Sequence, residues 1–126
     1  MSFEMDRDII IEKASFLLNY GYDLDQITDT NIRYTNEHNR ISISYNKFDD
    51  LSSISVFFFN ENELFNVGWI AFIQSDLILN LKQKLDNVEQ LLKYMEENYN
   101  NIVDVNYCTE SRHKVEEYIK NQMPTL

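Results

Sequence analysis

Four short runs rich in β-branched and aromatic residues, separated by brief polar stretches, constrain the fold of this chain more than any other feature. They are NIRYT (31–35), RISISYN (40–46), SISVFFF (53–59) and LFNVGWIAFIQ (64–74). The second run alternates most cleanly between apolar and polar residues, as a strand with one buried face does. Because a parallel crossover needs a dozen or more residues, the short connections predict antiparallel neighbours. The sequence therefore predicts a four-stranded antiparallel meander.

Helical periodicity flanks these strands on both sides. Residues 5–20 place Ile10, Ala14 and Leu17 at helical spacing, and Gly21 follows them as a C-cap candidate. After the strands, residues 86–99 and 110–122 have helical patterns, residues 75–85 are ambiguous, and NIVDVNYC (101–108) reads as a short strand or a linker. Segregated strands and helices indicate an α+β domain. We expect residues 1–126 to form one domain, with an N-terminal helix and two to three C-terminal helices packed on the sheet.

The side of the sheet away from the helices poses a problem, because large apolar residues occur on both parities of the last two runs. The residues predicted to face the helices are Ile41, Ile43, Tyr45, Ile54, Val56, Phe58, Phe65, Val67, Trp69 and Ile73. The opposite face then carries Ser42, Ser44, Asn46, Phe57, Phe59, Ile70 and Phe72. Three explanations stay open for the apolar members: the C-terminal helix covers them, they form a homodimer surface, or they dock another protein. Gly68 adds a further alternative, a bulge that reverses the parity after it.

Charge narrows the class of partner. The formal net charge is -10 at pH 7, and the 11 Lys and Arg residues are scattered among 21 acids. That field repels a phosphate backbone, so we expect no nucleic-acid partner and favour a basic protein. The acidic N-terminus, the single cysteine and apolar runs shorter than the ~20 residues of a membrane helix predict a cytoplasmic protein with no membrane association.

The candidates for chemistry are sparse. Cys108, His113 and Asp104 invite a nucleophile–base interpretation, but a lone cysteine is more often a small buried apolar group. The acids Asp23, Asp25 and Asp29 lack the glycine and the distal glutamate of a calcium loop. With two glycines in the whole chain, there is no Gly-rich phosphate loop. We predict no catalytic residue, no metal site and no cofactor, which favours a protein that is not an enzyme.

Segments such as NIRYTNEHNRISISYN and FNVGWIAFIQ, in a short, acidic, Asn-rich chain, resemble the small immunity proteins of bacterial polymorphic-toxin systems. The resemblance spans most of the chain and rests on no diagnostic motif, so no family residue is carried over. It implies a protein that binds and blocks a basic toxin through an acidic surface.

The sequence thus predicts a non-catalytic protein-binding domain whose surface combines aromatic rings with flanking acids. The predicted partner-binding residues are Phe57, Phe59, Asp49, Asp50, Glu61 and Glu63. One alternative is a structural homodimer. Another is a small ligand-binding or enzymatic domain with a pocket between the helices and the sheet, lined by Tyr20, Tyr22, Tyr45, Trp69 and Tyr94.

Overall fold

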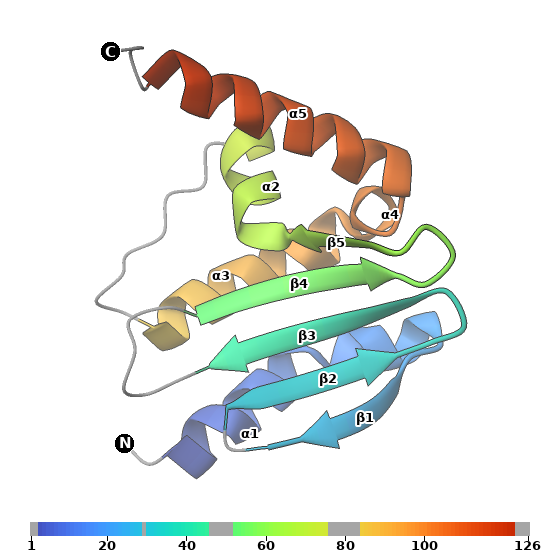
Figure 1. Cartoon of the computed structure of the whole chain (residues 1–126). Helices are drawn as coiled ribbons and strands as arrows, with labels where there is room; N and C mark the ends of the chain where they lie inside the picture. The colour runs from blue at the N-terminus through green and yellow to red at the C-terminus, as the bar shows by residue number, and fades with distance from the viewer. Residues whose placement is uncertain (1–2, 29, 46–51, 76–83, 123–126) are drawn as a thin grey trace.

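The α+β class and the antiparallel sheet are confirmed by a computed structural model, which describes residues 3–28, 30–45, 52–75 and 84–122 (Figure 1). The sheet has five strands rather than the four predicted. In chain order the elements are α1 (Phe3–Lys13), the 3₁₀ helix η1 (Ser15–Tyr20), β1 (Asp23–Ile27), β2 (Asn31–Thr35), β3 (Asn39–Tyr45), β4 (Ser52–Phe58), β5 (Glu63–Asn66), α2 (Val67–Ser75), α3 (Lys84–Glu97), α4 (Tyr99–Ile102) and α5 (Val105–Gln122).

The strands form a simple meander, because their spatial order β1-β2-β3-β4-β5 is their order in the chain and every neighbouring pair is antiparallel. The register aligns the apolar positions across the sheet: Ile41 of β3 lies between Tyr34 of β2 and Val56 of β4. All three side chains are buried. The alternation in the sequence therefore correctly placed the core on one face of the sheet.

The first difference from the prediction is β1, which lies in a segment that shows no strand pattern. All five of its residues are exposed, so they carry no apolar alternation. Its pairing with β2 is interrupted by an irregularity between Leu24 and Gln26. An edge strand of this kind is held by its neighbour's backbone rather than by core contacts, which explains why periodicity did not reveal it.

The second difference is larger, because residues 67–75 form a helix and not the second half of a strand. The side-chain oxygen of Asn66 accepts a hydrogen bond from the backbone N–H of Trp69 (3.2 Å), as an N-cap residue does. Val67, Ile70 and Ala71 are buried at helical spacing. The prediction that Trp69 faces the core is therefore wrong, as is the placing of Ile70 on the open face, and the proposed bulge at Gly68 does not arise.

The predicted end of the first helical segment agrees with the structure. Gly21 has φ +85° and its N–H donates to the Leu18 carbonyl, which confirms it as the C-cap of η1. The predicted helix over residues 5–20 is divided into α1 and η1. The strand or linker considered for residues 101–108 is wrong, since this segment spans the end of α4 and the first turn of α5.

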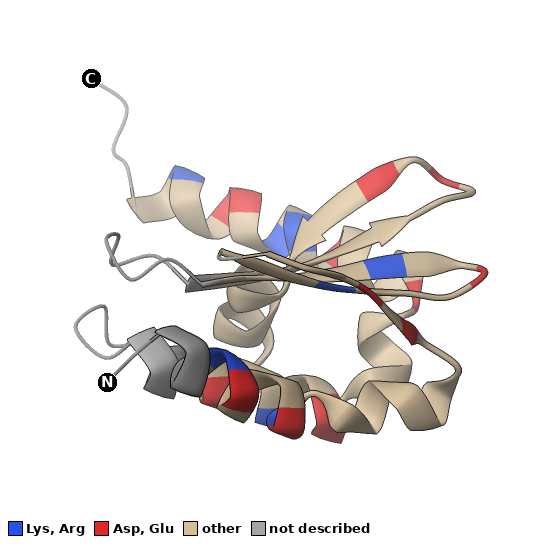
Figure 2. Cartoon of the chain, turned by 90° about the horizontal axis from the view of Figure 1, so that it is seen from below, with Lys and Arg blue, Asp and Glu red and all other residues tan. Residues whose placement is uncertain are grey.

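The helices cover one side of the sheet and one of its edges. Helices α1 and α3 lie behind the sheet and contact each other, and α3 packs on β3 and β4 (Figures 1 and 2). Helix α5 packs on α2 beside β5, so it does not fold across the sheet. In the described part of the chain, no helix lies over the opposite face of β2–β4 (Figure 1). Among the described residues, none of the helices is both long enough and apolar enough to cross a membrane.

Candidate functional site

The open face of the sheet is polar over most of its area and apolar at one end. The strand register arranges its residues in rows that cross the sheet. From the apolar end these rows are Thr35–Arg40–Phe57–Leu64, then Arg33–Ser42–Ser55–Asn66, then Asn31–Ser44–Ser53. The second and third rows consist mainly of short or polar side chains. Substantial apolar surface is therefore found only in the first of these rows.

Phe57 and Phe59 form the centre of that apolar end. Their rings meet edge to face at a centroid distance of 5.9 Å, and the Arg40 guanidinium lies 5.5 Å from the centroid of Phe59. Both rings are half-buried, so they are neither core residues nor fully exposed. Leu64, the cross-strand neighbour of Phe57, is 60% exposed. This end of the sheet therefore presents a largely exposed aliphatic side chain beside two aromatic rings.

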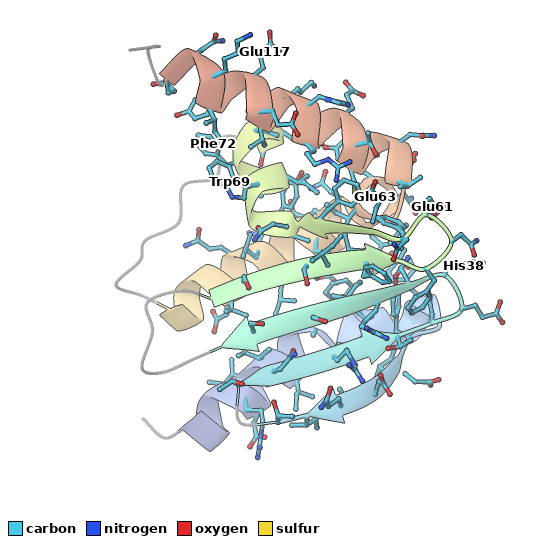
Figure 3. All side chains as sticks on the ribbon, in the orientation of Figure 1. His38, Glu61, Glu63, Trp69, Phe72 and Glu117 are labelled. Carbon is cyan, nitrogen blue, oxygen red and sulfur yellow. The ribbon has the colours of Figure 1, made fainter. Side chains whose placement is uncertain are left out.

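The predicted acidic frame around this end is only partly described. Asp49 and Asp50 lie outside the described residues. Glu61 is exposed in the turn between β4 and β5, and Glu63 lies at the start of β5 (Figure 3). Glu63 has the parity of Phe65, so it points toward the helical side and accepts a hydrogen bond from Arg112 (2.9 Å). That hydrogen bond and the guanidinium charge lower the pKa of Glu63.

A second group of rings, two exposed and one half-buried, continues from β5 onto the helices. Trp69 of α2 is 46% exposed, and its ring contacts Phe72, which in turn contacts Tyr118 of α5. Both contacts are edge to face, with centroid distances of 6.0 and 5.1 Å. Trp69 and Phe72 project from the same side of α2 (Figure 3). Sequence reasoning missed Trp69 and Leu64 as surface residues, although the helical spacing of Val67, Ile70 and Ala71 was a signal that could have placed Trp69 outside.

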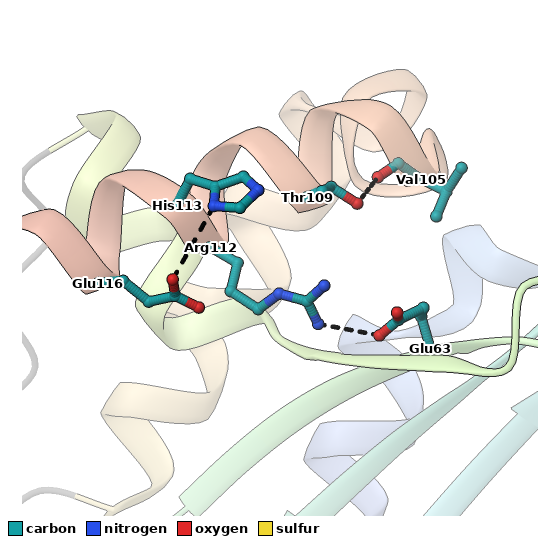
Figure 4. A network of polar contacts seen from close by, with 6 residues as sticks. All are labelled: Glu63, Val105, Thr109, Arg112, His113 and Glu116. Carbon is teal, nitrogen blue, oxygen red and sulfur yellow. Dashed lines mark hydrogen bonds and ion pairs between the residues drawn. The ribbon is translucent and has the colours of Figure 1, made fainter.

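Between β5 and α5 lies a groove of about 160 Å³. It is lined by Leu64, Phe65, Asn66, Trp69, Ile70, Cys108, Arg112 and Val115. Among these lining residues, the Arg112 guanidinium lies 4.7 Å from the centroid of Phe65 and donates a hydrogen bond to Glu63 (Figure 4). The remaining walls are mostly apolar. This hollow can take an apolar group of moderate size.

Cys108 and His113 do not form a nucleophile–base pair. Cys108 is buried, and its thiol donates to the Ile102 carbonyl (3.2 Å). Burial, and to a lesser degree the charge of Asp104, raises the pKa of Cys108 to about 12. His113 is exposed and lies 3.9 Å from Glu116 (Figure 4). The cysteine therefore serves as a small apolar group in the core.

The aromatic residues considered for an internal pocket have separate roles. Tyr22 and Tyr94 are buried, Tyr20 is exposed and stacked on Tyr99, and the side chain of Tyr45 lies outside the described residues. The Tyr22 hydroxyl donates to the side-chain oxygen of the buried Asn39. Of the four whose side chains the structure describes, Trp69 alone lines the groove beside β5.

The aspartates considered for calcium are not gathered into a site. Asp23 and Asp25 lie on β1, Asp29 is outside the described residues, and Asp25 accepts hydrogen bonds from Arg33 and Thr35. Among the described residues, no three His, Cys, Asp or Glu side chains are grouped closely enough to hold a metal ion. Comparison with protein-family models, curated proteins and solved structures gives no match for this chain.

Proposed function

We propose that this chain is a non-catalytic protein-binding domain that docks its partner on the apolar end of the open sheet face. The observation that carries the proposal is the exposure of Leu64 (60%) beside Phe57 and Phe59, at the end of a sheet face that no described helix covers over β2–β4. Burying a large apolar side chain stabilises a folded domain by about 1.5–3 kcal/mol. Leaving such a group in water next to two aromatic rings is typical of a contact site.

The chemistry of the partner follows from charge. The chain has a net charge of -10, so its long-range field attracts a basic protein and speeds the encounter with it. The exposed Glu61 lies in the turn next to the apolar end. A basic toxin domain, blocked by an acidic immunity protein, is the partner that the resemblance of the sequence implies, and we propose it as the biological role.

The proposal is tested by affinity capture from the source cells, with quantitative mass spectrometry of the captured proteins. The informative variant is Leu64→Lys, because that side chain already lies in water and its replacement leaves the core intact. Leu18→Lys is the matched control, since Leu18 is 53% exposed on η1, away from the sheet face. We expect one basic protein to be enriched by the wild type and by Leu18→Lys, and to be lost with Leu64→Lys.

Three results would contradict this function. Enrichment of the same proteins by all three baits would show that Leu64 has no part in binding. A dimer in sedimentation that Leu64→Lys dissociates, with no other protein captured, would instead establish the homodimer alternative. Turnover of a small molecule by the purified chain would favour the ligand-binding or enzymatic alternative.

A further inference from the structure

The two edges of the sheet are built differently. At the β1 edge, an irregular register and the carboxylates of Asp23 and Asp25 discourage a further strand from pairing. At the β5 edge, a groove lies between the strand and α5, and three successive residues of β5 line it. These are Leu64, Phe65 and Asn66. One edge is thus protected against pairing, while the other is open toward an apolar hollow.

The size of the groove suits a single side chain. Its volume is about 160 Å³, and a cavity of about 150 Å³ with apolar walls holds a benzene molecule. A Leu or Phe side chain is of this size. Ile70 and Val115 supply the apolar wall, with the exposed Leu64 and Trp69 at the mouth. When an extended peptide adds to a sheet edge, its backbone pairs with the edge strand and every second side chain enters the pocket beside it.

The charges around the groove favour particular residue types on either side of the bound peptide's apolar residue. Arg112 is paired with Glu63 at 2.9 Å, and Glu116 lies one turn further along α5 from Arg112. Glu61 is exposed in the adjacent turn, so the charged residues named at this groove are three acids and one arginine. The rim is therefore net acidic, as is the whole chain. Side chains of the peptide that point away from the pocket meet this rim, which favours Lys and Arg.

We propose that the groove between β5 and α5 binds an extended segment of a protein partner. In this segment, basic residues occupy every second position and one apolar residue lies between two of them. The proposal rests on the proposed function and names the part of the partner that the site recognises. The apolar residue fills the pocket above Ile70, the backbone pairs with β5, and the basic residues face Glu61 and Glu116.

Three synthetic peptides serve as probes. The first is acetyl-Lys-Thr-Lys-Leu-Lys-Thr-Lys-amide, the second has Ser in place of Leu, and the third has Glu in place of every Lys. Binding is mapped on the wild-type protein by ¹H–¹⁵N NMR, which requires no variant to fold. We expect the first peptide alone to shift the amides of Leu64, Phe65 and Asn66 and the indole N–H of Trp69. Equal shifts with the Ser or Glu peptide, shifts at β1 instead, or no shift with the first peptide would overturn the proposal.

A variant pair gives a second, independent measurement. Val115→Phe fills the groove from α5, whereas Thr109→Phe adds the same ring to α5 at a position that does not line the groove. By fluorescence anisotropy, we expect Val115→Phe to weaken binding of the first peptide about tenfold or more, because the apolar side chain loses its pocket. Thr109→Phe should leave the affinity within about twofold. A thermal melt of both variants checks that they fold.

The same variants separate this inference from the proposed function. A captured partner that is lost with Leu64→Lys but retained by Val115→Phe would leave the sheet face as the binding surface and refute the groove. A partner lost with both substitutions supports the groove. A partner that is retained by Leu64→Lys contradicts the proposed function. In that case the NMR shifts alone show whether the groove binds the peptide.

Discussion

Arg112 of α5 and Glu63 of β5 are joined across 49 positions of the chain by a hydrogen bond of 2.9 Å, with the guanidinium over the ring of Phe65. Arg112 thereby links the C-terminal helix to the edge of the sheet. Both side chains are about two-fifths exposed, so salt and water screen the pair.

The first prediction concerns pH. Because Arg112 lowers the pKa of Glu63, the stabilisation by this carboxylate is present at neutral pH and is lost as the pH falls through the lowered pKa. Glu63→Gln should therefore show a smaller loss of stability than the wild type between neutral and acidic pH. The measurement is the urea midpoint at both pH values. Glu61→Gln is the control; an identical response from both variants would contradict a specific role for the Arg112 contact.

The second prediction compares adjacent phenylalanines on opposite faces of β4. Phe58 is 4% exposed and its ring packs against Phe65, so Phe58→Ala should cost about 3–5 kcal/mol of unfolding free energy. Phe57 is half-buried on the open face, so Phe57→Ala should cost less, about 1–2 kcal/mol. Urea denaturation of the two variants measures both values. Equal costs would mean that Phe57 belongs to a covered core, and would remove part of the proposed binding surface.

The third prediction concerns the thiol of Cys108. Burial raises its pKa to about 12, so at pH 8 very little thiolate is present and reagents have no access to it. We expect a disulfide reagent such as dithionitrobenzoate to react much more slowly with the native protein than with the urea-unfolded protein. Comparable rates in the two states would point to an exposed, activated cysteine, and would reopen the nucleophile interpretation.

The fourth prediction tests the buried contact between Tyr22 and Asn39. Tyr22→Phe removes the donor and leaves the side-chain oxygen of the buried Asn39 without its hydroxyl partner, which should cost about 1–3 kcal/mol. Tyr20→Phe, on the exposed neighbour, should change the stability by less than about 0.5 kcal/mol. Thermal denaturation followed by circular dichroism compares the variants. A neutral Tyr22→Phe would show that Asn39 finds another donor.

The fifth prediction concerns backbone conformation. Gly21 has φ +85°, and a Cβ added there meets no atom within 4 Å, so the cost of Gly21→Ala arises from the left-handed conformation alone. We expect a loss of about 1 kcal/mol, with a smaller loss for Gly21→Asn, because asparagine tolerates this region better than alanine. The urea midpoints of the two variants supply the test. If alanine were tolerated as well as asparagine, the left-handed cap would not be needed for stability.

The parts of the fold that could be predicted are those in which burial imposes a period on the sequence. Strands β2, β3 and β4 bury every second residue, so Ile41, Ile54 and Val56 were assigned to the correct face. The Gly21 cap could also be predicted, because a helix often ends with a residue in the left-handed conformation, which glycine adopts most easily. The antiparallel arrangement followed from connections too short for a crossover.

The errors arose where local preference and burial gave different signals. Residues 67–75 contain Val, Trp, Phe and Ile, which favour strands, but Asn66 and the spacing of Val67, Ile70 and Ala71 specify a helix. Strand β1 has no buried residue, so no period marks it. At the candidate site, Phe57 and Phe59 could be singled out from sequence. The exposure of Leu64 and Trp69 was missed because it depends on where β5 ends and α2 begins, which the spacing of Val67, Ile70 and Ala71 could have indicated only for Trp69.

The strand order has a consequence for how the molecule acquires its structure. Every strand pairs with the next one along the chain, so the sheet can assemble by successive hairpins, and each closes a short loop at low entropic cost. Folding slows as contacts become more distant in sequence. We therefore expect the hairpins to form early. Helices α1 and α3 are in contact, but all five strands lie between them in the sequence. Their contact is therefore expected to form last and to complete the native state.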